Sequence, residues 1–355
     1  GAYYLDASSF TAFDVRLFTT LAGFTSFTSG DVDTETFAIF GDFTYDFTDQ
    51  LSVSLGGRYT WDERSSDIDR LRLLGGGSPL FGGAGVVVLT ETDFQGSRSF
   101  KEFTPRASVS FKPTPDHNLY ASYSKGFKGG GFDPRRVGVN APDLNGNGVR
   151  EQEEIADFFG FDPETVDSYE LGYKGSLLDN RLNLAVAAFR ADYEDVQIPA
   201  SVPCVVAGLP TFCGVTGNAG KARFQGIEVE ANAVLARDFL AARDRLSLAG
   251  TLGYIDAEYR EYITNVGGVP TEAADFREVQ YKPKWTASGT FNYTTPVGAG
   301  GLSLISTVSY RSKTYQFEIP NPFLDQKGYT LWDASLVWMS DDDRWSIGLH
   351  GKNLT

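Results

Sequence analysis

The feature that most constrains this sequence is an alternation of apolar and polar residues, repeated in segments of about ten residues along the chain. From Leu51 to Trp61, Leu, Val, Gly, Tyr and Trp occupy every second position, and Ser, Gly, Arg and Thr stand between them. A period of two places each kind of residue on its own face of a β-strand. Clear copies occur at 168–177, 226–235, 285–293 and 345–350, and weaker ones at 3–13, 36–47, 105–112, 117–127, 181–196, 245–259, 302–315 and 328–339. The pattern predicts about thirteen antiparallel strands.

The connections between these strands alternate strictly between long and short. Short connections are expected at 46–50, 113–117, 178–180, 236–244, 295–301 and 340–343, and longer ones at 14–35, 64–95, 128–166, 197–221, 260–282 and 316–327. Transmembrane barrels sort their connections in this way, with short turns at the periplasmic rim and long loops outside the cell. A soluble β-sandwich has no reason to do so. The sequence therefore predicts an all-β fold, an antiparallel transmembrane β-barrel.

Composition agrees with this prediction and excludes other classes of protein. Aromatic residues make up 14% of the chain, which favours strands, and no apolar run approaches the roughly 18 residues of a transmembrane helix. The formal net charge is −15 and basic residues form no cluster, so we exclude nucleic-acid binding. The first residues, beginning at Gly1, lack the features of a secretion signal, and we expect the chain to be cut from a longer precursor.

Aromatic residues gather toward the ends of the predicted strands, as at Tyr59, Trp61 and Trp285. Rings at these positions suit the two membrane–water interfaces, although ordinary packing between strands also places them there. Charged residues on the opposite face would be costly against lipid, so we assign them to the wall of the lumen. The candidate lumen contacts for a ligand are Arg58, Glu170, Lys174, Glu228, Glu230, His350 and Lys352. The alternative is that these residues are solvated wall positions or cross-strand pairs.

Four segments carry recognisable motifs. The run NLYASYSKGFKGGGF from Asn118 to Phe132 resembles the motif YASYSKGFKSGGF. The segment SYELGYK from Ser168 resembles SYELGLK, and FQGIEVE from Phe224 resembles GIELE. The segment GKNLT at the C-terminal end resembles KNLTD. All four comparison motifs belong to the barrels of TonB-dependent outer-membrane receptors, and they occur here in the family's order. The resemblance therefore covers nearly the whole chain.

The resemblance implies a barrel of about 22 strands that is filled by an N-terminal plug and energised through a Ton box. With the C-terminal KNLT as strand 21, the predicted strands correspond to roughly strands 9 to 21 of that barrel. We treat residues 1–355 as one partial barrel domain, with the plug, the Ton box, the early strands and the closing strand expected outside it. Such a piece is expected to form an open, curved sheet with two unpaired edges.

The implied function is import of a scarce nutrient across the bacterial outer membrane, and ferric siderophore, haem, cobalamin and oligosaccharide importers share this barrel. The implied partners are outer-membrane lipid, the small-molecule ligand, and TonB through the N-terminal region. A passive porin and a calcium-dependent surface adhesin or structural barrel are the alternatives. The two histidines, His117 and His350, stand apart and no catalytic motif is present, so we predict no enzyme activity.

One predicted extracellular loop matches the pattern of a calcium-binding loop. Its oxygen donors would be Asp143, Asn145, Asn147, the carbonyl of Val149, Glu151 and a bidentate Glu154, with Gly148 making the sharp turn. A solvated acidic turn without metal is the alternative. A short helix is expected after the loop, near 151–159.

Cys204 and Cys213 are the only cysteines and share one predicted extracellular loop. In an oxidising compartment this spacing predicts a disulfide, and two free thiols are the alternative. Closing so short a loop would stabilise it by roughly 2–3 kcal/mol, mostly by fixing the loop rather than the barrel.

Overall fold

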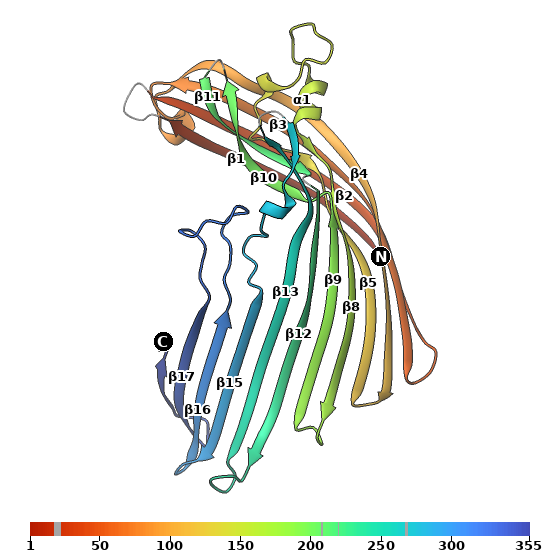
Figure 1. The fold of residues 1–355 in the computed structure, drawn as a ribbon, viewed down its shortest axis with the longest axis vertical. Helices are drawn as coiled ribbons and strands as arrows, with labels where there is room; N and C mark the ends of the chain where they lie inside the picture. The colour runs from red at the N-terminus through yellow and green to blue at the C-terminus, as the bar shows by residue number, and fades with distance from the viewer. Residues whose placement is uncertain (18–22, 207–208, 219, 267–268) are drawn as a thin grey trace.

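The computed structural model describes residues 1–17, 23–206, 209–218, 220–266 and 269–355, and its main element is one large antiparallel sheet (Figure 1). Thirteen strands follow one another in the order β1-β2-β3-β4-β5-β8-β9-β12-β13-β15-β16-β17-β18, and β14 pairs with β13. The thirteen are β1 (Ala2–Leu17), β2 (Phe24–Asp46), β3 (Leu51–Leu74), β4 (Val86–Thr114), β5 (His117–Lys128), β8 (Glu164–Leu177), β9 (Leu182–Glu194), β12 (Gly220–Arg237), β13 (Arg245–Val266), β15 (Trp285–Pro296), β16 (Gly300–Arg311), β17 (Tyr329–Ser340) and β18 (Ser346–Gly351). The predicted number and antiparallel pairing of strands are confirmed.

The smaller elements all lie in the longer connections. They are β6 (Gly131–Phe132), β7 (Gly160–Phe161), the helix α1 (Gln152–Phe159), the hairpin strands β10 (Gln197–Val206) and β11 (Leu209–Asn218), β14 (Val269–Glu272), and 3-10 turns at Pro79–Phe81, Gly138–Asn140 and Ala274–Phe276. The short helix expected near 151–159 is therefore present. Within the described ranges, the helices are too short or too polar to cross a membrane.

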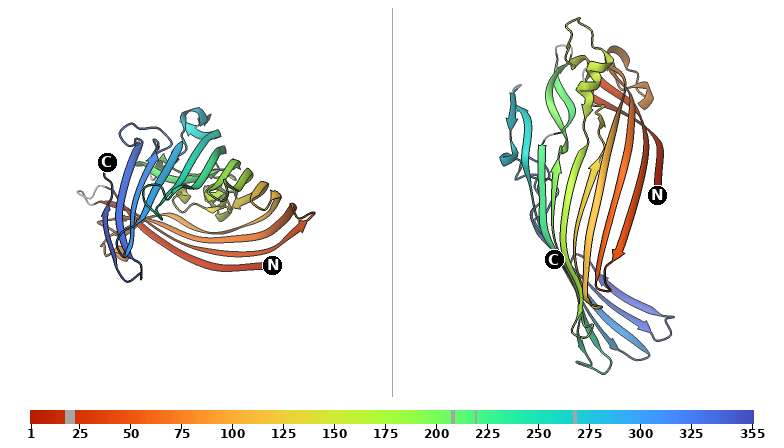
Figure 2. Two further views of the ribbon diagram at one scale, coloured as in Figure 1. Left: turned by 90° about the horizontal axis from the view of Figure 1, so that it is seen from below. Right: turned by 90° about the vertical axis from the view of Figure 1, so that its right-hand side faces the viewer.

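The sheet curves into an open trough, and β1 and β18 are its two edges, as expected for this chain (Figure 2). Strand register assigns alternate residues to the convex and concave faces. On the convex face the apolar side chains are exposed, as a surface against lipid requires. Examples on successive strands are Leu55, Phe103, Leu119, Leu171, Ile227, Leu252, Phe291, Leu304, Leu336 and Leu349.

Three strands at the N-terminal side are longer than predicted. β2, β3 and β4 contain 23, 24 and 29 residues, whereas about 9–11 residues cross a membrane. Most of the predicted loops 14–35 and 64–95 is therefore strand, and these boundaries were wrong. The apolar alternation stops above the membrane because the convex face there meets water and carries Asp, Glu and Ser instead. We call residues 24–36, 62–74 and 86–104 of these strands the upper wall.

Pro105 marks the level at which β4 separates from β5. The ladder between the two strands begins at Arg106, which pairs with Ser124, and β4 continues upward beside β3 alone. The backbone N of residue 105 faces β5, and proline has no N–H to donate there. Above this level β4 has no ladder with β5, and the segment after β5 packs against the upper wall there (Figure 1).

Candidate functional site

Six of the seven predicted lumen residues lie on the same face of the sheet, and the seventh, Lys352, lies just beyond its last strand. Ala187 on β9 pairs with Gly172 on one side and with Glu228 on the other, so the even-numbered residues of β8 and β12 share a face. The same register, followed strand by strand, brings Arg58 and His350 to this face, and it is the concave one.

Four of the seven line one hollow in the middle of the concave face. Its volume is about 360 Å³. Its lining includes Glu170 and Lys174 from β8, and Glu228 and Glu230 from β12. Tyr120 donates a hydrogen bond from its Oη to Glu170 Oε1 over 2.6 Å, and the Lys174 Nζ lies 5.5 Å from the centroid of the Tyr120 ring. The hollow thus combines three carboxylates, one ammonium group and one phenol.

The other three candidates do not join this hollow. Arg58 on β3 places its Cζ 4.9 Å from the ring centroid of Tyr3 and donates from Nε to Thr60 Oγ1 over 3.0 Å, so its guanidinium is held against the wall. His350 Nδ1 lies 2.9 Å from Ser335 Oγ on the neighbouring strand, and Lys352 is exposed just beyond β18. Their distance along the sheet separates them from the β8–β12 group.

The concave side of the upper wall is covered by a compact group of loops, which we call the cap. It consists of residues 129–163 and of the hairpin formed by β10 and β11. Phe132, Ile155 and Phe159 of the cap pack into one buried cluster with Ile68 and Phe94 of the upper wall. The sequence predicted long loops here, and the burial of these aromatic side chains shows that the loops are packed against the wall.

Buried charge joins the cap to the upper wall. Glu91 is fully buried, with Arg70 Nε 2.9 Å from its Oε2 and Arg72 Nη2 2.5 Å from its Oε1. Arg70 Nη1 also donates to the backbone oxygen of Arg135 over 2.8 Å, and Arg72 Nη1 donates to that of Val206 over 3.4 Å. Each arginine therefore connects the wall to a different part of the cap.

Inside the cap, the 133–137 segment is bonded to the hairpin. Arg135 donates to both oxygens of Asp133, from Nε and Nη2, and to Thr216 Oγ1. Burial alone would raise the pKa of Asp133, but the hydrogen bonds from Arg135 hold it below its usual value. Arg136 donates to the backbone oxygens of Phe158 and Thr216. These residues were not predicted from the sequence, because nothing local marks an arginine that will bond so far along the chain.

The glycine run of the first motif has a steric explanation. A Cβ on Gly129 would lie 2.6 Å from Asp62 Oδ2 of the upper wall, and one on Gly130 would clash with the backbone oxygen of Phe161. Glycine allows the chain leaving β5 to pass this close to the wall.

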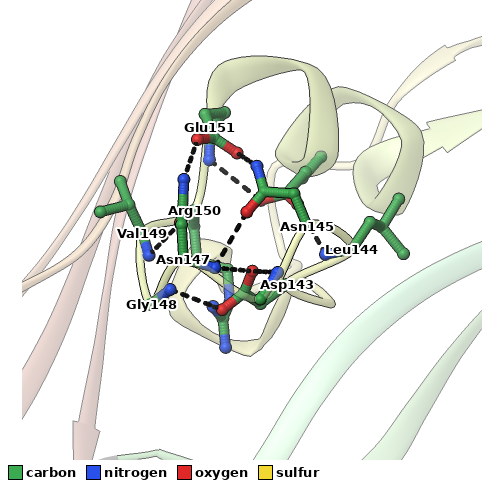
Figure 3. A network of polar contacts seen from close by, with 10 residues as sticks. Asp143, Leu144, Asn145, Asn147, Gly148, Val149, Arg150 and Glu151 are labelled. Atoms are coloured by element: carbon green, nitrogen blue, oxygen red, sulfur yellow. Dashed lines mark hydrogen bonds and ion pairs between the residues drawn. The ribbon is translucent and has the colours of Figure 1, made fainter.

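The 143–154 loop is closed by its own hydrogen bonds (Figure 3). Asp143 accepts the backbone N–H groups of Gly146 and Gly148 over 2.7 and 2.8 Å, and Arg150 Nη1 lies 3.1 Å from its Oδ2. The N–H of Gly148 is the largest of several contacts that lower the pKa of Asp143. Asn147 donates from its side-chain amide to Glu151 over 2.6 Å. Arg150 therefore already supplies positive charge to Asp143.

Glu154 serves the start of α1. Its Oε1 accepts the N–H of Leu144 over 2.6 Å, and its Oε2 accepts the N–H of Glu151 over 3.1 Å, which completes a capping box. In the part of the chain that the structure describes, no group of three or more His, Cys, Asp or Glu side chains is arranged to hold a metal ion.

Cys204 and Cys213 are joined by a disulfide across the β10–β11 hairpin. Cys213 is buried in a cluster with Val137 of the cap and Val206 of β10. The disulfide therefore lies at the contact between the hairpin and the 133–137 segment.

Comparisons with known proteins agree with this architecture. Residues 1–354 match a family model described as "TonB dependent receptor-like, beta-barrel". The chain is 27% identical over 308 residues to the ferric-pyoverdine M114 receptor PbuA of Pseudomonas sp. (strain M114), covering 86% of this chain and 30% of that protein. It is 30% identical over 166 residues to the metal-pseudopaline receptor CntO of Pseudomonas aeruginosa (strain UCBPP-PA14), covering 47% of this chain and 18% of that protein.

A solved structure shares the fold. The ferric yersiniabactin uptake receptor FyuA from Yersinia pestis superposes with a TM-score of 0.67 at 20% identity, covering 98% of this chain and 44% of that one. The chain thus spans less than half the length of each of these three proteins.

Proposed function

Because the chain belongs to the TonB-dependent receptor family, whose barrels lie in the bacterial outer membrane, we propose that it forms part of an importer for ferric siderophores or similar metal chelates. Members of this family are transport receptors rather than enzymes. The observation that carries the proposal is the match of the β-barrel family model to residues 1–354. The names of PbuA and CntO, which are receptors for metal chelates, favour this ligand class over haem, cobalamin or oligosaccharide.

We assign two roles to the parts of this chain. The extracellular loops and the concave face would meet the ligand, and the hollow lined by Glu170, Lys174, Glu228 and Glu230 would be the polar wall of its path. Charged groups on this face remain solvated in a water-filled lumen, whereas on the lipid face they would be strongly destabilising. Energy would come from TonB, through a region outside residues 1–355.

Uptake of radiolabelled iron supplied as ferric siderophores tests this proposal in cells that express the whole receptor. Uptake should saturate, and it should stop when a protonophore removes the proton-motive force. The double variant Glu228→Gln, Glu230→Gln should reduce uptake, whereas Arg344→Gln, which alters an exposed ion pair with Asp342 in the short turn between β17 and β18, should not. Uptake that persists with the protonophore would instead indicate a porin. An absence of uptake for every metal chelate would contradict the proposal.

The calcium loop also remains a proposal. Asp143, Asn145, Asn147 and Glu151 lie on one turn, and their oxygens are the ligand type that Ca²⁺ prefers. Binding would require Arg150 to leave Asp143. The side-chain amides of Asn145 and Asn147, which donate to Glu151, would have to turn their oxygens toward the ion. Glu154 would have to give up its two backbone hydrogen bonds to act as the bidentate ligand.

A further inference from the structure

Two groups of extracellular connections meet at Tyr262, near the upper end of β13. One group is the cap. The other consists of residues 273–284, after β14, and 312–328, between β16 and β17, which we call the rim loops. Tyr262 is only 5% exposed, and its side chain touches both groups.

On the cap side, the contact is apolar. Tyr262 shares a buried cluster with Ile198 of β10 and with Ala273, the first residue of the rim loops. Val196, just before β10, packs against the same cluster. The next residue, Gln197, donates from its side-chain amide to the backbone oxygens of Gly129 and Asp162, both over 3.0 Å. The strand that touches Tyr262 is therefore fixed to the rest of the cap at its first residue.

On the rim side, a polar contact adds to the apolar contact with Ala273. Tyr262 donates from Oη to Glu318 Oε2 over 2.6 Å, and the Arg277 Cζ lies 5.2 Å from the Tyr262 ring centroid. Glu318 also accepts the N–H of Glu278 at its backbone oxygen over 2.8 Å, which connects the two rim loops. One residue, Glu318, thus holds both the neighbouring rim loop and Tyr262.

The 312–328 loop is held together by its own contacts. Thr314 and Gln326 exchange backbone hydrogen bonds of 3.0 Å in both directions, and Lys313 Nζ lies 3.2 Å from Oδ2 of the buried Asp325. These contacts close the neck of the loop. At its far end Phe323 is 96% exposed, so a contact from outside the cell would reach the loop there.

We propose that the hydrogen bond between Tyr262 and Glu318 is the joint that couples the rim loops to the cap. Displacement of the 312–328 loop pulls on Glu318, releases Tyr262 and thereby loosens the first strand of the hairpin. The physical basis is a continuous set of contacts between elements that can each open locally. The joint depends only on packing between the extracellular loops, so it does not depend on which ligand the receptor transports.

Hydrogen exchange of the whole receptor in detergent micelles tests the joint. Tyr262→Phe keeps the ring in its cluster and removes only the hydroxyl group. Loss of one hydrogen bond of ordinary strength should raise local opening about fivefold, so amides at 315–318 and at 197–201 should both exchange about five times faster. Glu318→Gln keeps an acceptor and removes the charge, so it should give a smaller increase at the same two sites.

Tyr259→Phe is the matched control, because the Tyr259 ring packs edge-on at 5.1 Å from that of Tyr262 and no hydrogen bond joins its hydroxyl group to Glu318. It should leave exchange at 315–318 unchanged. Faster exchange at 315–318 in Tyr262→Phe with unchanged exchange at 197–201 would overturn the coupling, as would unchanged exchange at both sites. An equal effect of Tyr259→Phe at both sites would assign the result to general loosening of the cluster. If Tyr262→Phe does not assemble, hydrogen exchange at 315–318 and 197–201 in Glu318→Gln decides the test.

Discussion

Arg70 on β3 and Glu91 on β4 form a buried ion pair, with Nε 2.9 Å from Oε2, on the concave side of the upper wall. Arg72 adds a second guanidinium to the same carboxylate, and both arginines also bond to backbone oxygens of the cap. Glu91 therefore holds two cations at the contact between the wall and the cap.

We predict that Glu91→Gln detaches the cap while the barrel remains folded. Removing one partner of a buried ion pair costs about 3–5 kcal/mol, because the remaining charge is left without compensation. Limited proteolysis should show faster cleavage within 129–163, with unchanged heat modifiability of the barrel. Asp42→Asn, in an exposed ion pair with Arg106, should change stability by no more than about 1 kcal/mol. Equal protease resistance of Glu91→Gln and the wild type would contradict the assigned role.

Like charges face each other on the convex side of the upper wall. Asp69 pairs directly with Asp93, and Asp31 with Asp67. Burial, followed by the charges of Asp93 and Asp67, raises the pKa of Asp69. We predict that Asp93→Asn stabilises the upper wall at pH 7 by roughly 0.2–1 kcal/mol, since opposed like charges are destabilising.

The sign of the pH effect follows from the same contacts. A carboxyl group whose pKa is raised by folding adds stability when protonated, and this contribution is lost as pH rises through its folded pKa. Hydrogen exchange of the upper-wall amides, corrected for the intrinsic exchange rate, should therefore slow as the pH falls toward the folded pKa of Asp69. This slowing should be smaller in Asp93→Asn than in the wild type. A larger pH effect in the variant than in the wild type would refute the repulsion.

Asp244 fixes the turn between β12 and β13. Burial alone would raise the pKa of Asp244. Hydrogen bonds from the backbone N–H groups of Phe239, Leu240 and Ala241 and from the Tyr293 hydroxyl outweigh this effect and lower the pKa to about 2. Its contribution to stability is present above the unfolded pKa and is lost as pH falls through about 2. We predict that Asp244→Asn destabilises the turn by about 1–3 kcal/mol at neutral pH. Protease cleavage at 238–244 should accelerate, and a resistant turn in the variant would exclude this role.

The disulfide should stabilise the hairpin and leave the barrel unaffected. Replacing both Cys204 and Cys213 by Ser removes the cross-link at the buried contact with Val137. On the chain-entropy account the local cost is roughly 2–3 kcal/mol. Amides at 201–206 should exchange faster while the melting temperature of the barrel stays the same. A lower barrel melting temperature would show that the hairpin supports more than the cap.

Calcium binding can be separated from the structural role of the loop with two variants. If Ca²⁺ binds, it should do so with a Kd of about 10⁻⁴ to 10⁻³ M, as extracellular sites do. Asp143→Ala should abolish calcium-dependent protection of 140–160 from protease. Glu154→Gln should loosen the loop with or without calcium, because it disturbs the bonds to Leu144 and Glu151 at the start of α1. Identical cleavage of the wild type with calcium and with chelator would end the calcium assignment.

The sequence by itself determined the features that depend on neighbouring residues. An alternation of period two marks a strand wherever lipid meets one face and water the other, so the strands, the side of the sheet for Glu170 and Glu228, and the short turns could all be read directly. The partner of Cys204 was also determined, since the chain has only one other cysteine.

The tertiary structure decided what depends on residues far apart. The upper wall was read as loops because water lies on its convex face and the cap on its concave face, so no alternation of apolar residues remains. Arg70 finds the backbone of Arg135, 65 residues along the chain, because the cap packs against the concave side of the upper wall. Tyr262 meets Glu318 across 56 residues in the same way. Such pairs leave no local pattern, because their energy comes from burial and charge compensation that exist only once the sheet has brought them together.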